Sequence, residues 1–168
     1  MKKFVITHKD PEMLELVGKT DHKVLAKWAI ECAQHVLPFF EDKYPDDDRP
    51  RKAIETLQKW IGDGIFKMAV IRKVSLDSHA AARDVGEDSP ARSAARACGQ
   101  AVATVHVPRH AYGSAIYAQQ AVFRANPTNA EAAAAKERDR QFERLLALKR
   151  NPERSEWNNR LFKLGKIT

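Results

Sequence analysis

Residues 89–124, SPARSAARACGQAVATVHVPRHAYGSAIYAQQAVFR, decide the fold. Ser89 and Pro90 mark a helix start, because serine caps free N–H groups and proline favours the first helical position. Small and apolar residues then recur at helical spacing: Ala91, Ala94, Cys98, Ala101, Val102 and Val105. A second helix, apolar on most sides, is expected from Pro108 to Arg124. This weakly charged pair predicts the centre of a helical bundle.

Three earlier segments also carry apolar residues three or four positions apart: residues 25–39, 53–61 and 71–85. Asp21 offers an N-cap to the first segment. Asp46-Asp47-Asp48 opens the second, because carboxylates suit the positive end of the helix dipole. Gly62 and Gly64 are expected to end that second helix.

The C-terminal part predicts two more helices. Thr128 followed three residues later by Glu131 is a capping-box pattern, so a helix is expected over residues 128–150. Asn151-Pro152 is expected to begin a last short helix over residues 152–163.

The whole chain, residues 1–168, is therefore predicted to be one all-α domain, a bundle of about six to seven helices. Phe4-Val5-Ile6-Thr7 is the one candidate strand, and a lone strand has nothing to pair with. Trp28, Trp60 and Leu57 are predicted core residues.

Composition bounds the function without naming it. The net charge is +7, which suits an acidic protein partner, nucleic acid or anionic lipid. Basic residues are scattered along the chain, as on a solvated surface, and do not form a nucleic-acid footprint. Cys32 and Cys98 have no disulfide or metal-type spacing, and no segment resembles a signal peptide or membrane span. A soluble protein of the cytoplasm is expected.

Two polar segments allow alternative interpretations. Asp46–Arg51 could bind a metal, a phosphate or a charged partner, or could simply cap a helix and form local ion pairs. His106 and His110 lie four apart and could hold a metal, but Pro108 separates them and no third ligand is near in sequence. No metal site and no cofactor are predicted.

A third constellation combines polar and small residues. His79 and Arg83 share a helix face, and Gly99 and Gly113 lie within helices, where glycine costs about 1 kcal/mol relative to alanine. Close helix crossing explains such glycines. Polar side chains are then expected to converge between helices, and Arg49, Arg51, His79, Arg83, Arg96 and His106 are predicted to line one polar groove. No nucleophile–base set is visible, so no catalytic residue is predicted.

Together these segments carry a family resemblance. They occur in the same order as in a group of small helical prokaryotic proteins: Cys32–Pro38, Asp48–Glu55 with Trp60, His79–Arg83, Ala95–Val107 and Gly113–Ala118. That group resembles the fifth class of immunity proteins of bacterial polymorphic toxin systems. The resemblance covers about residues 23–122. It departs at Gln100, where the family more often has histidine, and at Ser114, where it more often has a small residue.

The resemblance implies a non-enzymatic protein that binds and neutralises a cognate toxin. The basic charge then implies a toxin with an acidic surface, whereas an inhibitor that mimics nucleic acid would itself be acidic. Candidate partner-binding residues are Asp48, Arg49, Arg51, His79, Arg83, Arg96, His106, His110 and Tyr117. The alternatives are a metal-dependent or nucleic-acid-acting, exonuclease-like enzyme, and a basic accessory protein that contacts nucleic acid.

Overall fold

The computed structural model describes residues 3–4 and 10–153. Over those residues the chain forms eight helices and no strand, which confirms the all-α fold. Seven helices are at least eight residues long, and α3 is a single turn. The bounds are α1 Pro11–Gly18, α2 His22–Val36, α3 Pro38–Glu41, α4 Arg49–Asp63, α5 Met68–Asp84, α6 Pro90–Ala103, α7 His110–Ala125 and α8 Ala130–Arg150.

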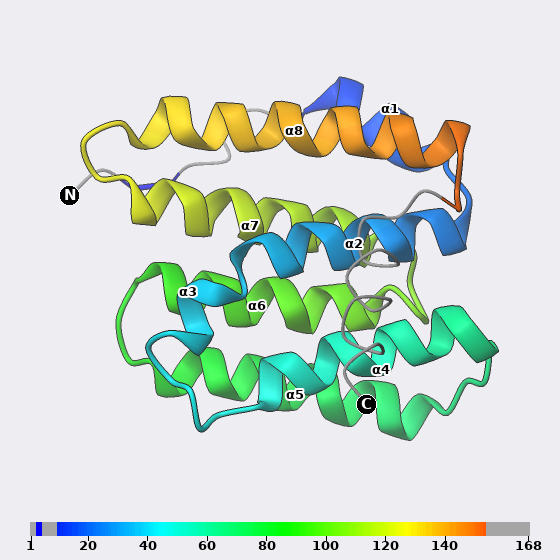
Figure 1. The fold of residues 1–168 in the computed structure, drawn as a ribbon, viewed down its shortest axis with the longest axis horizontal. Coiled ribbons are helices and arrows are strands. Elements are labelled where there is room, and N and C mark those ends of the chain that lie inside the picture. The colour runs from blue at the N-terminus through cyan, green and yellow to red at the C-terminus, as the bar shows by residue number, and fades with distance from the viewer. Residues whose placement is uncertain (1–2, 5–9, 154–168) are drawn as a thin grey trace, which may run out of the picture.

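The helices lie in two layers (Figure 1). One layer runs α8, α7, α6, α5, each helix packed on the next, and α2 and α4 lie over it. The predicted central pair is confirmed as the heart of this arrangement, because α6 contacts α2, α3, α4, α5 and α7. Arg92, Arg96 and Gln100, four residues apart, are only partly buried and form the outward stripe of α6.

Small residues allow this close packing. Nearly all of α6 outside its outward stripe is buried, and its alanines have little or no exposed surface. Trp28 and Leu57 are fully buried, as predicted. Trp60 was also predicted to be a core residue, but it is only half-buried and packs against the edge of the core. Its ring lies at the edge of α4, where it contacts the imidazole of His22 with ring centroids 5.1 Å apart.

Several local signals set the helix ends as predicted. The Asp21 side chain accepts a hydrogen bond from the Lys23 amide (3.0 Å), and Ser89 accepts one from the Arg92 amide (3.3 Å). Gly64 ends α4 in the left-handed conformation, at φ +69°, whereas Gly62 lies inside the helix.

Other ends differ from the prediction. The capping box at Thr128 does not form: Asn129 precedes α8, which begins at Ala130. Ala130 is buried with Phe123, so packing between helices fixes this start and local capping does not. Helix α7 begins at His110, two residues after Pro108.

Helix α1 was not predicted from the sequence, although Asp10 caps it by accepting a hydrogen bond from the Met13 amide (3.1 Å) and Pro11 begins it. The predicted helix over 152–163 and residues 5–7 of the candidate strand fall largely or wholly outside the described residues. None of the helices over residues 10–153 is both long and apolar enough to cross a membrane.

Candidate functional site

Helices α5 and α6 approach so closely that the His79 side chain of α5 packs against the α6 backbone at Gly99. Ser75 Oγ donates to the Gly99 carbonyl (2.9 Å) and Ser78 Oγ to the Ala95 carbonyl (2.7 Å). A Cβ atom at Gly99 would lie 2.8 Å from His79 Nε2, closer than real contacts allow. Glycine is therefore needed where the His79 imidazole crosses α6.

A second close approach joins α6 to the start of α7. His110 Nδ1 donates to Gln100 Oε1 (2.7 Å), and a Cβ at Gly113 would lie 2.7 Å from that same oxygen. The rings of His106 and His110 lie with centroids 5.6 Å apart. Both glycines that the sequence singled out thus make room for polar side chains.

We call His79, Arg83, Arg96, His106 and His110 the basic cluster. Burial, with Arg96, Arg83 and His110 as further causes, lowers the pKa of His79 to about 4. Burial and then His106 lower the pKa of His110. The imidazoles of His79 and His110 are therefore neutral at pH 7, and Arg83 and Arg96 are the permanently charged members of the cluster.

The basic cluster contains polar atoms without partners. The Nδ1 atoms of His79 and His106 are buried and have no hydrogen-bond partner among the described residues. Buried polar atoms without a partner are rare in native proteins, because burial removes their hydrogen bonds to water and no protein hydrogen bond replaces them. The cluster is thus polar, partly enclosed and incompletely paired.

The remaining predicted site residues lie elsewhere or are paired. Asp48 pairs with Lys52 (2.9 Å) and Arg51 with Glu41 (2.6 Å). Arg49 bridges Asp47 (2.6 Å) on its own turn and Asp84 (2.8 Å) at the end of α5.

Arg51 and Tyr117 complete the set. Arg51 is close enough to Cys98 to influence it electrostatically. Cys98 and Arg96 are two residues apart on α6 and so point to nearly opposite sides. Tyr117, on α7, is half-buried against the core.

An arginine pair that sequence reasoning missed adjoins the basic cluster. Arg92 (3.0 Å) and Arg124 (3.3 Å) share the carboxylate of Asp88, and Arg124 Nη1 also donates to Ser93 Oγ (2.9 Å). Arg124 and Asp88 line a pocket of about 420 Å³ whose other walls are Lys3, Phe4, Phe123, Pro127 and Ala130.

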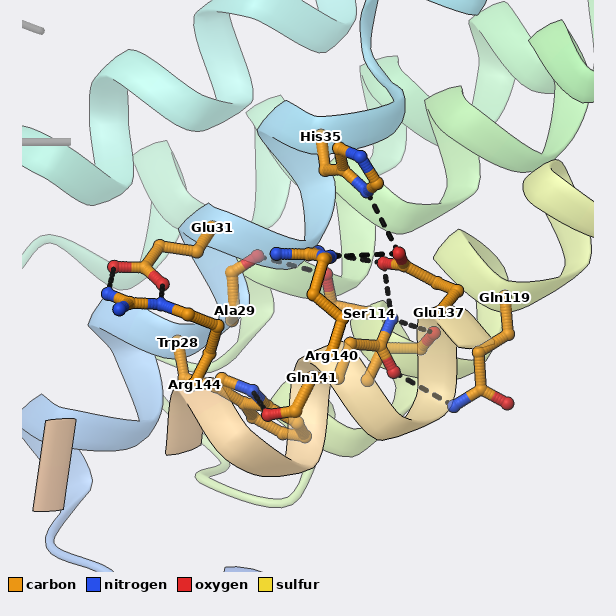
Figure 2. A network of polar contacts seen from close by, with 11 residues as sticks. Trp28, Ala29, Glu31, His35, Ser114, Gln119, Glu137, Arg140, Gln141 and Arg144 are labelled. Carbon is orange, nitrogen blue, oxygen red and sulfur yellow. Dashed lines mark hydrogen bonds and ion pairs between the residues drawn. The ribbon is translucent and has the colours of Figure 1, made fainter. Parts of the chain in front are cut away.

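A second polar region, also missed, binds α8 to α2 and α7; we call it the α8 network (Figure 2). Arg144 donates to both carboxylate oxygens of Glu31 (2.9 and 3.1 Å). Glu137 accepts from Arg140 (2.8 and 2.9 Å) and lies 3.0 Å from His35 Nδ1. Glu137 and Gln141, four residues apart on one face of α8, were the signal available in the sequence.

Gln141 is the fully buried centre of the α8 network. Its Nε2 donates to the Ala115 carbonyl (3.0 Å), and its Oε1 accepts from Gln119 Nε2 (2.8 Å). Its backbone carbonyl accepts from Trp28 Nε1 (2.9 Å). Burial would raise the pKa of Glu137, but the hydrogen bonds from Arg140 and His35 outweigh it and lower the pKa to about 2.

The thiols and carboxylates show what chemistry the arrangement offers. Burial raises the pKa of both Cys32 and Cys98, so neither thiol is activated as a nucleophile. Within residues 10–153 no three histidine, cysteine, aspartate or glutamate side chains gather as a metal site would require. The exposed chemistry of the site is that of guanidinium donors and imidazoles.

Fold and site together define a small all-α protein that carries a cationic cluster on its four-helix layer. The model of the family described as Imm-5 like putative immunity protein matches residues 15–148, and the chain belongs to this family. The match confirms the resemblance seen in the sequence and extends it to α8. Neither a curated protein nor a solved structure matches the chain.

Proposed function

We propose that the protein binds a cognate toxin directly and neutralises it by occupying its surface, with the basic cluster at the centre of the contact. Membership of an immunity-protein family over residues 15–148 carries the proposal. The pairing of charges supports this location, since the cluster holds polar groups that have no partner among the residues that the structure describes.

The physical properties of the cluster suit recognition. His79, Arg83, Arg96 and His110 stand on three packed helices, and His106 lies in the short turn between α6 and α7, so little conformational entropy is lost when a partner binds. Arginine presents a planar fork of donors that matches a carboxylate. The net charge of +7 would steer an acidic toxin surface toward the protein and speed association.

Stoichiometry distinguishes this function from an enzymatic one. A toxin whose gene is found beside that of this protein is co-expressed with increasing amounts of the protein, and cell growth is recorded. A binding inhibitor protects only when it reaches about one copy per toxin, and the two proteins co-elute as a complex. Full protection at a small fraction of one copy per toxin, without a complex, would instead support an enzyme.

The second candidate function is a metal-dependent enzyme, because the ring centroids of His106 and His110 lie 5.6 Å apart. Elemental analysis of untagged protein tests it. We expect no stoichiometric zinc. Zinc that disappears in the H106A/H110A variant would favour the enzyme.

A further inference from the structure

Arg96 differs from every other partly buried arginine of the described chain. The others each have an acceptor or an acidic partner: Arg49, Arg51, Arg92, Arg124, Arg138, Arg140 and Arg144. Arg96 has no hydrogen-bond acceptor and no ion-pair partner over residues 3–4 and 10–153. A half-buried guanidinium has lost part of its hydration, so an unused fork of donors there favours an anionic partner.

The carboxylate that acts electrostatically on Arg96 is already paired with other arginines. Asp88 pairs with Arg92 and Arg124, and its influence on Arg96 is only electrostatic. Arg96 and Arg83 together face His79, which is neutral at pH 7. The positive charge on Arg96 is therefore not cancelled by a contact within the described chain.

The pocket beside Arg124 lies close to Arg96. Arg92 and Arg96 are one helical turn apart, about 6 Å along α6, and Arg124 acts electrostatically on both. Phe4, Phe123, Pro127 and Ala130 give the pocket apolar walls, with the Phe4 and Phe123 rings 5.4 Å apart. Two or three residues of extended chain span about 7–10 Å, which is comparable with the one-turn separation of Arg96 from Arg92.

We propose that the partner is held as an extended acidic and apolar segment of a protein, with one carboxylate on Arg96 and an apolar side chain two or three residues away in the pocket walled by Phe4 and Phe123. The proposal rests on the proposed function and names the chemistry of the partner. A protein segment is favoured over nucleic acid because four of the seven residues that line the pocket are apolar, and because the carboxylate of Asp88, which also lines it, repels phosphates.

Selection from a random dodecapeptide display library tests this chemistry. The baits are the wild-type protein, R96A, F4A and the control R150A, which removes an exposed arginine at the end of α8. Peptides enriched on wild type should share Asp or Glu two or three residues from Phe, Leu, Ile or Trp. The acidic preference should disappear on R96A and the apolar preference on F4A, while R150A should reproduce the wild-type result.

Affinity measurements complete the test. The best peptide is labelled and its binding followed by fluorescence anisotropy. R96A should weaken binding about tenfold or more, as expected for loss of a charge-assisted hydrogen-bond pair, and R150A less than about twofold. Melting temperatures of all variants show whether they are folded.

Defined results would overturn the proposal. These are an absence of enriched peptides, an equal loss of affinity in R96A and R150A, or displacement of the peptide by oligothymidylate at lower concentration than by the unlabelled peptide. The co-expression test separates the two proposals: wild type that protects cells without selecting such peptides refutes the segment but leaves toxin neutralisation standing.

Discussion

The α8 network and the basic cluster contain similar side chains, but they differ in whether those side chains are paired. In the α8 network the two buried carboxylates, Glu31 and Glu137, each receive an arginine, and the amide of Gln141 is bonded at both its nitrogen and its oxygen. In the basic cluster, within the part of the chain that the structure describes, Arg96 has no acceptor, and His79 and His106 each bury an unpaired nitrogen. The polar groups of the α8 network bond one another inside the fold, whereas those of the basic cluster are left available for a bound partner.

The difference shows that the number of charges in a region says little about its role. Charged residues are common in both regions, but pairing separates them. A buried charge with its partner fixes how helices dock, and removing one partner leaves the other without compensation. A cation with no partner adds little to stability, so its removal should change binding and leave the fold intact.

The largest expected effect lies at Trp28, the aromatic member of the α8 network. W28A should lower the free energy of unfolding by about 3–5 kcal/mol, because it empties a fully buried site and removes the donor to Gln141. W60A should lower it by only about 1–2 kcal/mol, since Trp60 is half-buried. Urea denaturation followed by circular dichroism measures both. Equal losses would contradict the burial difference.

The comparison between regions is most direct for Glu137 and Arg96. E137A should lower the free energy of unfolding by about 2 kcal/mol, because Arg140 and Gln141 lose a buried acceptor. R96A should stay within about 0.5 kcal/mol of wild type, the usual range for a residue that makes no contact of this kind. Chemical denaturation of both variants under one set of conditions is the measurement. A loss for R96A as large as that for E137A would mean that Arg96 is structural.

The two regions should also respond to acid in different pH ranges. The pKa of His79 is lowered from 6.5 to about 4, so its contribution is present above pH 6.5 and is lost as pH falls toward 4. The pKa of Glu137 is lowered from 4.5 to about 2, so its contribution is present above pH 4.5 and is lost as pH falls toward 2.

Thermal melting across pH 2–8 tests this assignment. H79Q should flatten the decline in melting temperature between pH 6.5 and 4 and leave the decline below pH 4.5 in place. E137Q should reduce only the decline below pH 4.5. An unchanged profile for H79Q over pH 6.5–4 would show that His79 does not sense acid there.

The smallest expected effect on stability belongs to Gly99. G99A places a methyl group 2.8 Å from His79 Nε2, and the imidazole, at the free end of its side chain, should swing away. Alanine favours a helix over glycine by up to about 1 kcal/mol, so the melting temperature should barely change while toxin binding weakens. Gly62, inside α4 with open space beside it, supplies the matched control G62A. Loss of binding in both variants would remove the argument from His79.

The sequence predicted what local chemistry determines. Asp21, Ser89 and Gly64 end or begin helices as expected, because each acts on backbone groups within a few residues. The start of α8 was placed two residues early, because the packing of Ala130 on Phe123 overrides the capping pattern at Thr128.

The candidate site was predictable only in part, because its contacts join residues that are far apart along the chain. Helical spacing and the two glycines pointed to His79, Arg83 and Arg96, which the structure brings together with His106 and His110. Arg49 was grouped with them in the sequence analysis, yet its partner Asp84 lies 35 residues away along the chain. Glu31 and Arg144 are 113 residues apart. Spacing shows which side chains share a face, but it does not show which of them find partners.

The burial of both thiols makes their reactivity a probe of local opening of the bundle. Cys32 lies under α8, where burial and the charge of Glu137 raise its pKa, and Cys98 is enclosed on the inner side of α6. A thiol reagent can therefore reach each cysteine only when the helices around it open: α8 lies beside Cys32, and α3 and α4 lie beside Cys98. The rates at which the two cysteines are modified would report how often the helices around each cysteine open, in one protein without any added label.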